Sequence, residues 1–552
     1  MALYYSACIQ GILWSLMGMG LYISFRILGF ADLTSEASFT LGAGVAAILI
    51  QSGYSPLLAT LLAIGAGMLA GLVTGWLTTF LAIPGLLASI ITMTGLYSVS
   101  LRVMGQPNLS LRGSETLFSL MEQLIPSSDL ARLVLGLIFV LLVVAMLSLL
   151  FKMDLGQALV ATGDNRIMAD SLGINTHRML RLALMLSNGL IALSGALVAQ
   201  DNGFADIQLG NGTVVIAFSA IVIGEVIFRQ QLSLTKRLMT VVLGAVIYRL
   251  ILVAVLQLGF NANDFRFLSA FVLVLFLAGQ ISSNAISDKR EVTKMAYFEL
   301  SDVSKYFRKS DGKQVLGLDQ INLSLEKGQV LGIIGTNGAG KSTLLNSIAG
   351  SLAIDQGTIQ IDGQEVSQWG PQKRAKLIGR VFQNPSHGTA PRMTVFENLV
   401  LAQKRGQRRL FNFSLTEANC QALAEELKSF GLGLEDKLDL PMESLSGGQR
   451  QVVSLIMATL NWSKLLLLDE HTAALDPRMA RQVMEDSRRL IQEKGLTTLM
   501  ITHHLQDALD FSNKIAIMHQ ARIEHVFDGD EIQQLTAAKL MDYLNQLSYQ
   551  VG

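Results

Sequence analysis

Cysteine, proline and charge are all scarce in this chain. Its 552 residues include two cysteines, Cys8 and Cys420, and 9 prolines, and only 16% of the residues are charged. Two distant cysteines exclude a disulfide framework and a cysteine metal cluster. The formal net charge is +0, which excludes the basic excess of a nucleic-acid-binding protein. The first residues, Met1–Tyr5, lack the basic start and the cleavage site of a signal peptide, so we expect the first apolar stretch to be retained.

Long apolar runs are what the sequence has in excess. Hydrophobic residues make up 51% of the chain, and they are concentrated before residue 283, whereas Lys, Arg, Asp and Glu become frequent after it. The length also exceeds that of one ordinary domain. We therefore predict an α-helical polytopic membrane domain over 1–283, a polar linker over 284–296 and a soluble α/β domain over 297–552.

A helix needs about 20 mostly apolar residues to cross a lipid bilayer. This criterion predicts roughly nine spans, at about 6–25, 37–53, 56–80, 85–104, 132–151, 180–200, 212–228, 237–257 and 266–283. An odd number places the two ends of this half on opposite faces of the membrane. Basic residues near the span ends, such as Lys152, Arg178 and Lys289, mark the cytoplasmic face. We therefore expect the soluble half in the cytoplasm and the N-terminus outside.

Polar breaks and ionisable residues interrupt the apolar half. The breaks fall at 29–34, 83–85 and 202–206, and such backbone is tolerated at membrane depth only where protein or a cavity surrounds it. Ionisable residues either face a transport path or pair and snorkel at helix ends. For Asp32 and Glu36 both interpretations stay open, and for Arg249 we expect the structural one. Arg26 and Glu225 are the other two ionisable residues of this kind.

Two stretches of the apolar half resemble a known family. Phe30-Ala31-Asp32, followed by Thr40–Ala46, resembles the early segment of the branched-chain amino acid permeases of bacterial ABC importers. Gly203–Asp206, leading to Ala217–Gly224, is similar to a later segment of those permeases and of the related sugar and nucleoside permeases. The resemblance implies a bacterial cell-membrane permease for a small polar metabolite. An amino acid, aromatic or branched-chain, is the first expectation.

One predicted cytoplasmic loop has the features of a short capped helix. Asp164 and Asn165 are predicted to cap a helix that Gly173 ends. In the resembling permeases this segment is the coupling helix, which docks into the ATPase. The alternative is a plain amphipathic connector.

The soluble half contains a strand, a glycine-rich loop and a helix start in succession. Val330–Ile334 is the apolar strand, and the loop after it has the G-x-x-x-x-G-K-S spacing of a phosphate-binding loop. Its N–H groups would surround the phosphates of ATP at a helix N-terminus. Lys341 is expected to reach the β- and γ-phosphates and Ser342 to bind Mg²⁺. The predicted ATP-binding residues are Gly335, Thr336, Asn337, Gly338, Ala339, Gly340, Lys341, Ser342 and Thr343.

A second glycine motif, Leu445–Gln449, precedes a helical run. Ser446 and the glycines after it would open a second helix N-terminus that attracts anions. This motif is the signature of the ABC ATPases, and on it the soluble half is identified as a member. The family implies that each ATP lies between the phosphate loop of one copy and the signature of a second. The chain is therefore expected to form a homodimer in which the signature residues Ser446, Gly447, Gly448 and Gln449 contact ATP.

Candidate catalytic groups follow two further apolar strands. Leu465–Leu468 leads to Asp469, expected to hold Mg²⁺ through water, and to Glu470, expected to be the general base. Thr497–Thr502 leads to His503, which matches the switch histidine that contacts the γ-phosphate and Glu470 in the family. His471 stands where the family usually has Pro, and His504 where it has Asp. Neither departure removes a catalytic group.

Three further residues complete the predicted ATP site. The amide oxygen of Gln383, after an apolar strand, is expected to join the Mg²⁺ shell. Asp476 matches the loop that crosses the dimer interface in the family. Phe307 is expected to stack on adenine, because a nucleobase offers mainly a flat face. Phe307 matches the family position better than Tyr306, and a core or hairpin aromatic is the alternative.

The resemblance implies an ATP hydrolase coupled to transport, a translocase. Fusion of a membrane half to an ATPase is commonest among exporters, which have roughly six spans per chain, whereas the larger predicted number and the importer-like motifs favour import. An importer of this class receives its substrate from a separate extracytoplasmic binding protein. An exporter half-transporter and an ATP-driven membrane sensor without net flux stay open as alternatives.

Overall fold

The computed structural model describes residues 2–227, 234–257, 297–308, 314–336, 338–407, 409–460, 463–473 and 475–549. By its internal contacts the chain forms two compact units. Unit 1 consists of Met1–Gly163 and Thr176–Asn284, and unit 2 of Asp164–Asn175 and Ala285–Gly552. The short segment Asp164–Asn175 therefore belongs to unit 2, although it interrupts unit 1 in sequence. The predicted linker, 284–296, lies outside the described residues.

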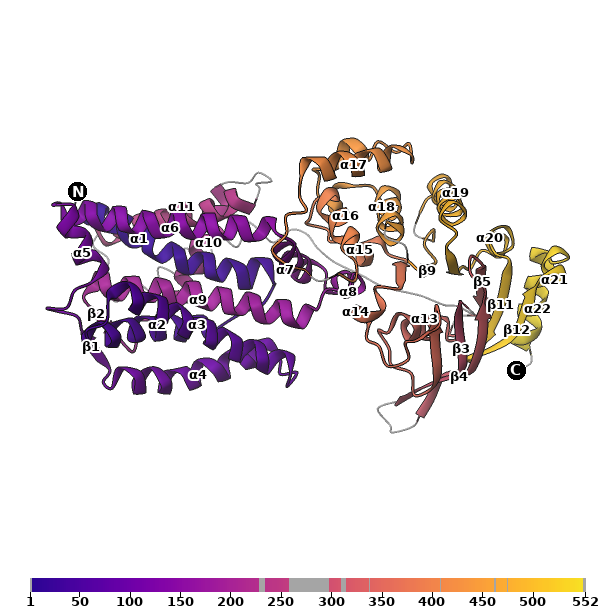
Figure 1. Cartoon of the computed structure of the whole chain (residues 1–552), viewed down its shortest axis with the longest axis horizontal. Helices are drawn as coiled ribbons and strands as arrows, with labels where there is room; N and C mark the ends of the chain where they lie inside the picture. The colour runs from indigo at the N-terminus through magenta and orange to yellow at the C-terminus, as the bar shows by residue number, and fades with distance from the viewer. Residues whose placement is uncertain are drawn as a thin grey trace. The chain divides into compact units, whose positions relative to one another are not determined.

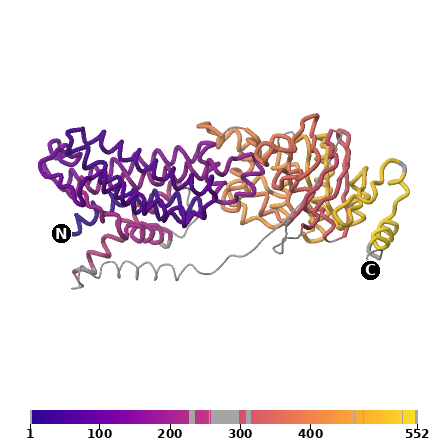
Figure 2. The backbone as a smooth tube through the Cα atoms, turned by 90° about the horizontal axis from the view of Figure 1, so that it is seen from below, coloured from indigo at the N-terminus to yellow at the C-terminus, as the bar shows by residue number. Residues whose placement is uncertain are grey.

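Unit 1 is a bundle of long helices that run side by side (Figures 1 and 2). Helix α1 (Ala2–Leu21) continues into a π-helical segment (Tyr22–Ile27). A short antiparallel pair, β1 (Asn108–Ser110) with β2 (Phe204–Asp206), joins two of the polar connections. The other helices are α2 (Thr34–Gln51), α3 (Pro56–Thr79), α4 (Gly85–Met104), α5 (Leu117–Leu124), α6 (Ser128–Lys152), α7 (Asp154–Asp164), α9 (Thr176–Asn202), α10 (Thr213–Ile227) and α11 (Leu234–Gln257).

Among the described residues, six helices are long and apolar enough to cross a membrane. They are Leu3–Ile27, Pro56–Thr79, Gly85–Met104, Ser128–Lys152, Thr176–Asn202 and Thr235–Ala254, and each coincides with a predicted span. The predicted span at 212–228 falls on the shorter apolar helix Thr213–Glu225. The predicted span at 37–53 falls on α2, which is not among the six helices. The predicted span at 266–283 lies outside the described residues. The predicted total of nine and the predicted orientation stay predictions.

Small residues let the helices of unit 1 approach closely. A Cβ added at Gly71 of α3 would lie 2.1 Å from the Leu184 carbonyl oxygen of α9, and one at Gly42 of α2 would lie 2.2 Å from the Ala192 oxygen. The hydrophobic effect does not drive helices together in lipid, so close van der Waals packing of this kind stabilises membrane bundles. The glycines of α2 and α3 therefore bring both helices against α9.

The ionisable residues of unit 1 contact protein groups. Nε of Arg26 donates to Glu225 at 2.7 Å. Asp32, 3% exposed, accepts from the Thr34 backbone at 3.0 Å and from Asn188 at 2.7 Å. Arg26 and Glu225 thus pair with each other, and Asp32 is hydrogen-bonded inside the bundle.

Glu36 and Arg249 also have protein neighbours. Glu36 accepts from the Gly212 backbone at 2.9 Å. The Arg249 guanidinium lies 4.7 Å from the ring centroid of Trp14, which stacks on Phe39 at 4.9 Å. The structural interpretation predicted for Arg249 agrees with this cation–π contact.

Unit 2 is built around two sheets. Among the described residues the larger sheet has six strands in the order β12 (Arg522–Asp528), β11 (Lys514–His519), β5 (Val330–Gly335), β10 (Thr497–Ile501), β9 (Leu465–Asp469) and β8 (Ile378–Val381). Strand β12 is antiparallel to β11, and the other neighbours are parallel. The smaller, antiparallel sheet has the order β4 (Gln314–Leu325), β3 (Phe298–Arg308), β6 (Gln356–Ile361) and β7 (Gln364–Glu365).

Helices cover the parallel sheet, whose strands are buried apolar runs typical of a doubly covered sheet (Figure 1). The helices of unit 2 are α8 (Arg166–Ser171), α13 (Lys341–Ala349), α14 (Pro371–Arg374), α15 (Pro385–Gly388), α16 (Val395–Gln403), α17 (Glu417–Lys428), α18 (Gly447–Thr459), α19 (Pro477–Lys494), α20 (Leu505–Phe511), α21 (Asp530–Gln533) and α22 (Ala537–Tyr549). An apolar helical unit followed by an α/β unit confirms the predicted fold class.

Candidate functional site

The carboxyl ends of four parallel strands bring the predicted catalytic residues to one edge of the sheet. Strand β10 pairs with β5 and with β9, and β9 pairs with β8. The glycine loop follows β5, Glu470 follows β9, and Gln383 and His503 come soon after β8 and β10. Ligands of open α/β sheets bind at this edge. The strand–loop–helix context required for the phosphate loop is therefore present.

The phosphate loop has the conformation that its glycines allow. Gly338 and Gly340 have φ values of 80° and 94°, the left-handed region that favours glycine. Lys341, 7% exposed, begins α13, and its Nζ donates to the Gly335 and Thr336 carbonyl oxygens at 2.8 Å and 3.1 Å. The ammonium group thus lies over the loop in which phosphates are predicted to bind. Asn337 lies outside the described residues.

Two side chains hold the carboxylate of Glu470. Nε2 of His503 lies 2.5 Å from its Oε1, and Nε2 of Gln383 donates to its Oε2 at 2.8 Å. The backbone of Glu470 has φ 40°, so this residue sits in a left-handed conformation that costs energy in a side chain larger than glycine. The predicted contact between His503 and Glu470 is present. For Gln383, the amide nitrogen faces Glu470, while its predicted role as a Mg²⁺ ligand stays a prediction.

Asp469 has an arginine neighbour that the sequence analysis missed. Asp469 is 1% exposed, and the Arg380 guanidinium lies 3.4 Å from its carboxylate. The same guanidinium donates a hydrogen bond to the Asn346 side chain of α13 at 3.2 Å. Arg380 lies on β8 and thereby links the end of β9 to the helix that begins at the phosphate loop. An arginine inside a strand carries no sequence signal for this role, because its partners come from two distant segments.

The signature motif opens a helix as predicted. Ser446 caps α18: its hydroxyl accepts from the Gln449 N–H at 3.3 Å, and the Gln449 side chain accepts from the Ser446 N–H at 3.3 Å. This reciprocal capping box fixes the first turn. Ser446 and Gly447 are exposed, whereas Gly448 packs so closely on Met479 that an added Cβ would lie 2.4 Å from its Cε.

Asp476 and Phe307 occupy defined places. Asp476 caps α19, accepting from the Arg478 and Met479 N–H groups at 3.1 Å each. The Phe307 ring lies against Gly317, where an added Cβ would be 2.4 Å from the ring and 3.2 Å from Thr343. Phe307 is 40% exposed and lies near the start of α13, so its ring is available for stacking. Both predicted contacts with nucleotide stay predictions.

The two unusual histidines differ in environment. His471 is 2% exposed and its Nε2 lies 3.0 Å from the Ser487 hydroxyl. Burial lowers the pKa of His471 from 6.5 to about 4, because the charged imidazolium loses its hydration. His504 is exposed and precedes α20. His471 thus fills a core position next to the predicted base.

Helix α8 is held in unit 2 by its first residues. Asn165 caps α8 by accepting from the Met168 N–H at 3.0 Å, as predicted. Its amide nitrogen also donates to the Ser386 and Thr389 carbonyl oxygens, at 2.7 Å each, on and just after α15. Asp164 is the last residue of α7 rather than a cap, and its carboxylate pairs with Arg392. The predicted cap is therefore correct for Asn165 and wrong for Asp164.

The second half of α8 is held by α14 and by the loop after α16. Nε2 of Gln372 donates to Asp170 at 2.9 Å, and the Gly406 N–H donates to the Leu172 carbonyl oxygen at 3.1 Å. Gly173, predicted to end the helix, has φ 80° and follows it closely. These contacts fix both ends of α8.

Helix α14 also reaches the helix of the phosphate loop. Arg374, 1% exposed, donates to the Ser347 and Ile348 carbonyl oxygens at 2.7 Å and 2.6 Å. These carbonyls belong to the last turn of α13, where a cation is favourable. One four-residue helix therefore contacts α8 through Gln372 and α13 through Arg374. Sequence reasoning missed both residues, because they lie in a basic stretch without a motif.

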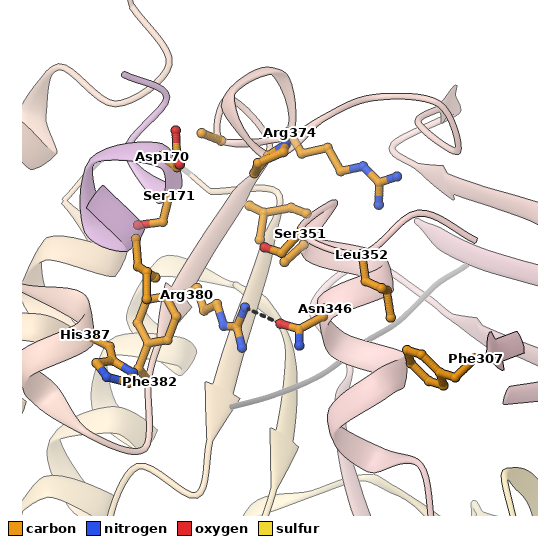
Figure 3. A pocket seen from close by; sticks show the side chains of 15 residues that line it. Asp170, Ser171, Phe307, Asn346, Ser351, Leu352, Arg374, Arg380, Phe382 and His387 are labelled. Atoms are coloured by element: carbon orange, nitrogen blue, oxygen red, sulfur yellow. Dashed lines mark hydrogen bonds between the residues drawn. The ribbon is translucent and has the colours of Figure 1, made fainter. Parts of the chain in front are cut away.

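A pocket of about 460 Å³ lies between these elements (Figure 3). Asp170 and Ser171 of α8 lie on one side of it, and Phe307 lies at the other (Figure 3). Arg380 is central and bonds to Asn346. The pocket is thus lined by residues of both α8 and α13.

Comparison with known proteins agrees with both halves. Residues 318–473 match the ABC transporter family, and residues 3–277 match the branched-chain amino acid transport system permease component. A tyrosine transport system permease protein of Clostridioides difficile (strain R20291) is 39% identical over 273 residues, which cover 50% of this chain and 90% of that protein. A tyrosine transport ATP-binding protein of the same organism is 38% identical over 245 residues, covering 44% of this chain and 97% of that protein.

Solved structures of ATP-binding cassettes also match part of the chain. A dimeric ATP-binding cassette, MJ0796, in a post-hydrolysis state with ADP and phosphate is 28% identical, with a TM-score of 0.38 over 42% of this chain and 98% of that chain. The two sequence relatives are separate polypeptides that match successive halves of this one. The chain therefore belongs to the ABC transporters and joins a permease domain to an ABC ATPase domain in one polypeptide.

Proposed function

We propose that two copies of this chain form an ATP-driven importer for an aromatic amino acid, with tyrosine as the first candidate. The observation that carries the proposal is that one half is similar to a tyrosine transport system permease protein and the other half to a tyrosine transport ATP-binding protein of the same organism. An extracytoplasmic binding protein, encoded separately, would deliver the substrate. The permease domain would lie in a bacterial cell membrane, with the ATPase domain in the cytoplasm.

The ATP site would be composed of residues from both copies. Supporting this, Ser446 and Gly447 are exposed at the start of α18, and Gly338 and Ser342 are exposed at the phosphate loop. The two motifs each lie at a helix N-terminus, which attracts phosphate. In the homodimer, the loop of one copy and the signature of its partner would enclose each ATP, giving two equivalent sites.

Within each site, the residues have separate tasks. Phe307 would stack on adenine, and Lys341 would turn from the loop carbonyls to the β- and γ-phosphates. Ser342, Asp469 and Gln383 supply the hydroxyl, carboxylate and amide oxygens that suit Mg²⁺, which would neutralise phosphate charge when bound. Glu470 would accept the proton of the attacking water, oriented by His503 at 2.5 Å and Gln383 at 2.8 Å.

Coupling to the permease would pass through α8. ATP binding closes a dimer because ATP binds the closed state more tightly, and α8 would move with the domain that holds it. Two connections support this route. Asn165 reaches α15, which follows Gln383 closely, and Asp170 reaches α13 through Gln372 and Arg374.

Reconstitution into vesicles tests the direction and the substrate. The full chain would be given ATP on the side of its ATPase domain, and a tyrosine-binding protein with labelled tyrosine on the other side. Tyrosine uptake that needs both ATP and the binding protein supports the proposal. Efflux without the binding protein would identify an exporter, and ATPase activity that responds to ligand without flux would identify a sensor.

A further inference from the structure

Arg249 is a charged residue within an apolar helix of unit 1. It lies on α11, inside the stretch Thr235–Ala254 that is long and apolar enough to cross a membrane. A charged side chain at membrane depth is costly, so such residues are rare and usually mark a path for a solute or an ion. The groups around the Arg249 guanidinium therefore indicate its role.

Helices α1 and α11 pack closely and run antiparallel. A Cβ added at Gly11 of α1 would lie 2.7 Å from the Cα atom of Val246, and one at Gly18 would lie 2.9 Å from Cγ1 of Val241. Trp14 lies between the two glycines on α1. Its level on α11 is therefore that of residues 241–246, which precede Arg249.

The guanidinium of Arg249 turns back along α11 to reach Trp14. It lies 4.7 Å from the centroid of the Trp14 ring. Arg249 is closer to the Gln257 end of α11 than to the Leu234 end, so a side chain that snorkelled to the nearer membrane surface would point the other way. The charge is therefore directed toward the middle of the helix.

The contact with Trp14 uses the face of the guanidinium and leaves the N–H groups at its edge without a protein acceptor. Among the described residues, Nε of Arg249 is buried without a hydrogen-bond partner, and no carboxylate pairs with the charge. A guanidinium presents its N–H donors in a fork that matches the two oxygens of a carboxylate. A buried donor without an acceptor costs free energy, which a carboxylate from a ligand would recover.

Trp14 is itself held by three helices. It is 8% exposed, and its ring stacks on Phe39 of α2 with 4.9 Å between the centroids. Nε1 of Trp14 donates to the Gln10 side chain at 3.1 Å. Gln10 in turn donates to Asp201 of α9 at 2.8 Å. The surface on which the Arg249 guanidinium lies is thus fixed by α1, α2 and α9.

We propose that Arg249 binds the carboxylate of the transported solute inside the permease domain. The ligand class is a small metabolite that carries a carboxylate, such as an amino acid. Its two oxygens accept hydrogen bonds from the edge of the guanidinium, while Trp14 holds the face. The proposal rests on the proposed function, in which the solute is an amino acid, and it requires neither import nor export.

Binding of labelled tyrosine to the full-length chain in phosphatidylcholine nanodiscs tests the proposal. Tyramine is the competitor, because it keeps the ring and the amino group of tyrosine but lacks the carboxylate. Arg249→Met removes the charge, and Arg249→Lys keeps the charge without the fork. Lys236→Met makes the same change of charge at an exposed position of α11 and is the matched control.

We expect the wild type and Lys236→Met to bind tyrosine about 10- to 100-fold more tightly than tyramine, because a carboxylate bonded to a guanidinium is a strong contact. Arg249→Met should lose this preference, since the carboxylate then has no partner, and Arg249→Lys should be intermediate. A purely structural role of Arg249 would leave the preference unchanged in a folded variant, and thermal unfolding of each variant checks the fold.

Equal affinities for tyrosine and tyramine in the wild type would overturn the proposal without any variant. An unchanged preference in Arg249→Met would overturn it as well, and so would the absence of tyrosine binding to the wild type. Tyrosine uptake in vesicles that does not depend on Arg249 would leave the proposed function standing. Tyrosine binding that depends on Arg249, without uptake, would contradict only the proposed function.

Discussion

The amide nitrogen of Gln383 donates a hydrogen bond to the carboxylate of Glu470 across 2.8 Å. Gln383 directly precedes the segment that Asn165 of α8 holds through the Ser386 carbonyl oxygen. The predicted base of ATP hydrolysis and the predicted coupling segment are thus separated by few contacts. We therefore expect a displacement of α8 to change the position of Gln383, which is bonded to Glu470.

Replacing Glu470 by Gln tests its assignment as the base. Glu470→Gln keeps the shape but removes the proton acceptor, so ATP hydrolysis should fall about 10²- to 10⁴-fold while ATP still binds. Phosphate release and retention of labelled ATP measure the two effects. Substantial steady-state hydrolysis in this variant would contradict the assignment.

Replacing Asn165 by Ala tests coupling through α8. Asn165→Ala removes the cap of α8 and its two bonds to the ATPase domain, each contributing about 0.5–1.5 kcal/mol. We expect transport to fall several-fold more than ATP hydrolysis measured in detergent. Ser171→Ala on the same helix is the control, because the Ser171 hydroxyl bonds within α8, to the Met168 carbonyl oxygen. Equal transport in the two variants would argue against this route.

His471 should make the ATPase domain less stable in acid. Its pKa of about 4 in the folded chain lies below the usual 6.5, so the unfolded chain takes up the proton first as the pH falls. The stabilisation is full above about pH 6.5 and is lost as the pH falls to about 4, a loss of roughly 3 kcal/mol.

Thermal unfolding of the full chain across this pH range measures the effect. His471→Asn should flatten the fall of the ATPase-domain transition between neutral and acidic pH, whereas exposed His504→Asn should not. An unchanged pH dependence in His471→Asn would show that other groups cause it.

Two glycines of α3 provide a matched test of packing in unit 1. A Cβ at Gly71 would lie 2.1 Å from the Leu184 carbonyl oxygen, whereas one at Gly65 would meet nothing within 4 Å. Gly71→Val should therefore destabilise the bundle by about 1–3 kcal/mol or more, seen as a lower unfolding temperature in detergent. Gly65→Val should change it little, and similar losses in both variants would contradict the close approach of α3 and α9.

The sequence was informative where chemistry needs a local pattern. The phosphate loop, the Ser446 signature and the strand that ends at Asp469 are contiguous motifs, so their places at the sheet edge followed from strand order. The contact between α8 and the ATPase domain was implied by family resemblance. The residues that make it, Gln372, Ser386 and Gly406, come from separate segments. A hydrogen bond between distant segments leaves no local pattern, and the same holds for Arg380.

Span counting had a different limit. The apolar criterion located the long helices, but α2 is an intermediate case because Thr34, Ser35, Glu36, Ser38 and Thr40 fill its first turns. These polar residues bond inside the bundle, as between Ser38 and Asn188 at 2.7 Å. A hydropathy criterion counts these polar side chains as unfavourable in a membrane, although hydrogen bonds to buried partners satisfy their polar groups.

The most direct test of the composite ATP site mixes two inactive copies. Lys341→Ala damages the phosphate loop and Ser446→Arg damages the signature, so each variant alone has two damaged sites. A mixed dimer has one intact site, made from the loop of one copy and the signature of the other. Random pairing of equal amounts should restore about a quarter of wild-type ATP hydrolysis, and tyrosine uptake with it. Activity no greater than that of the separate variants would contradict the account.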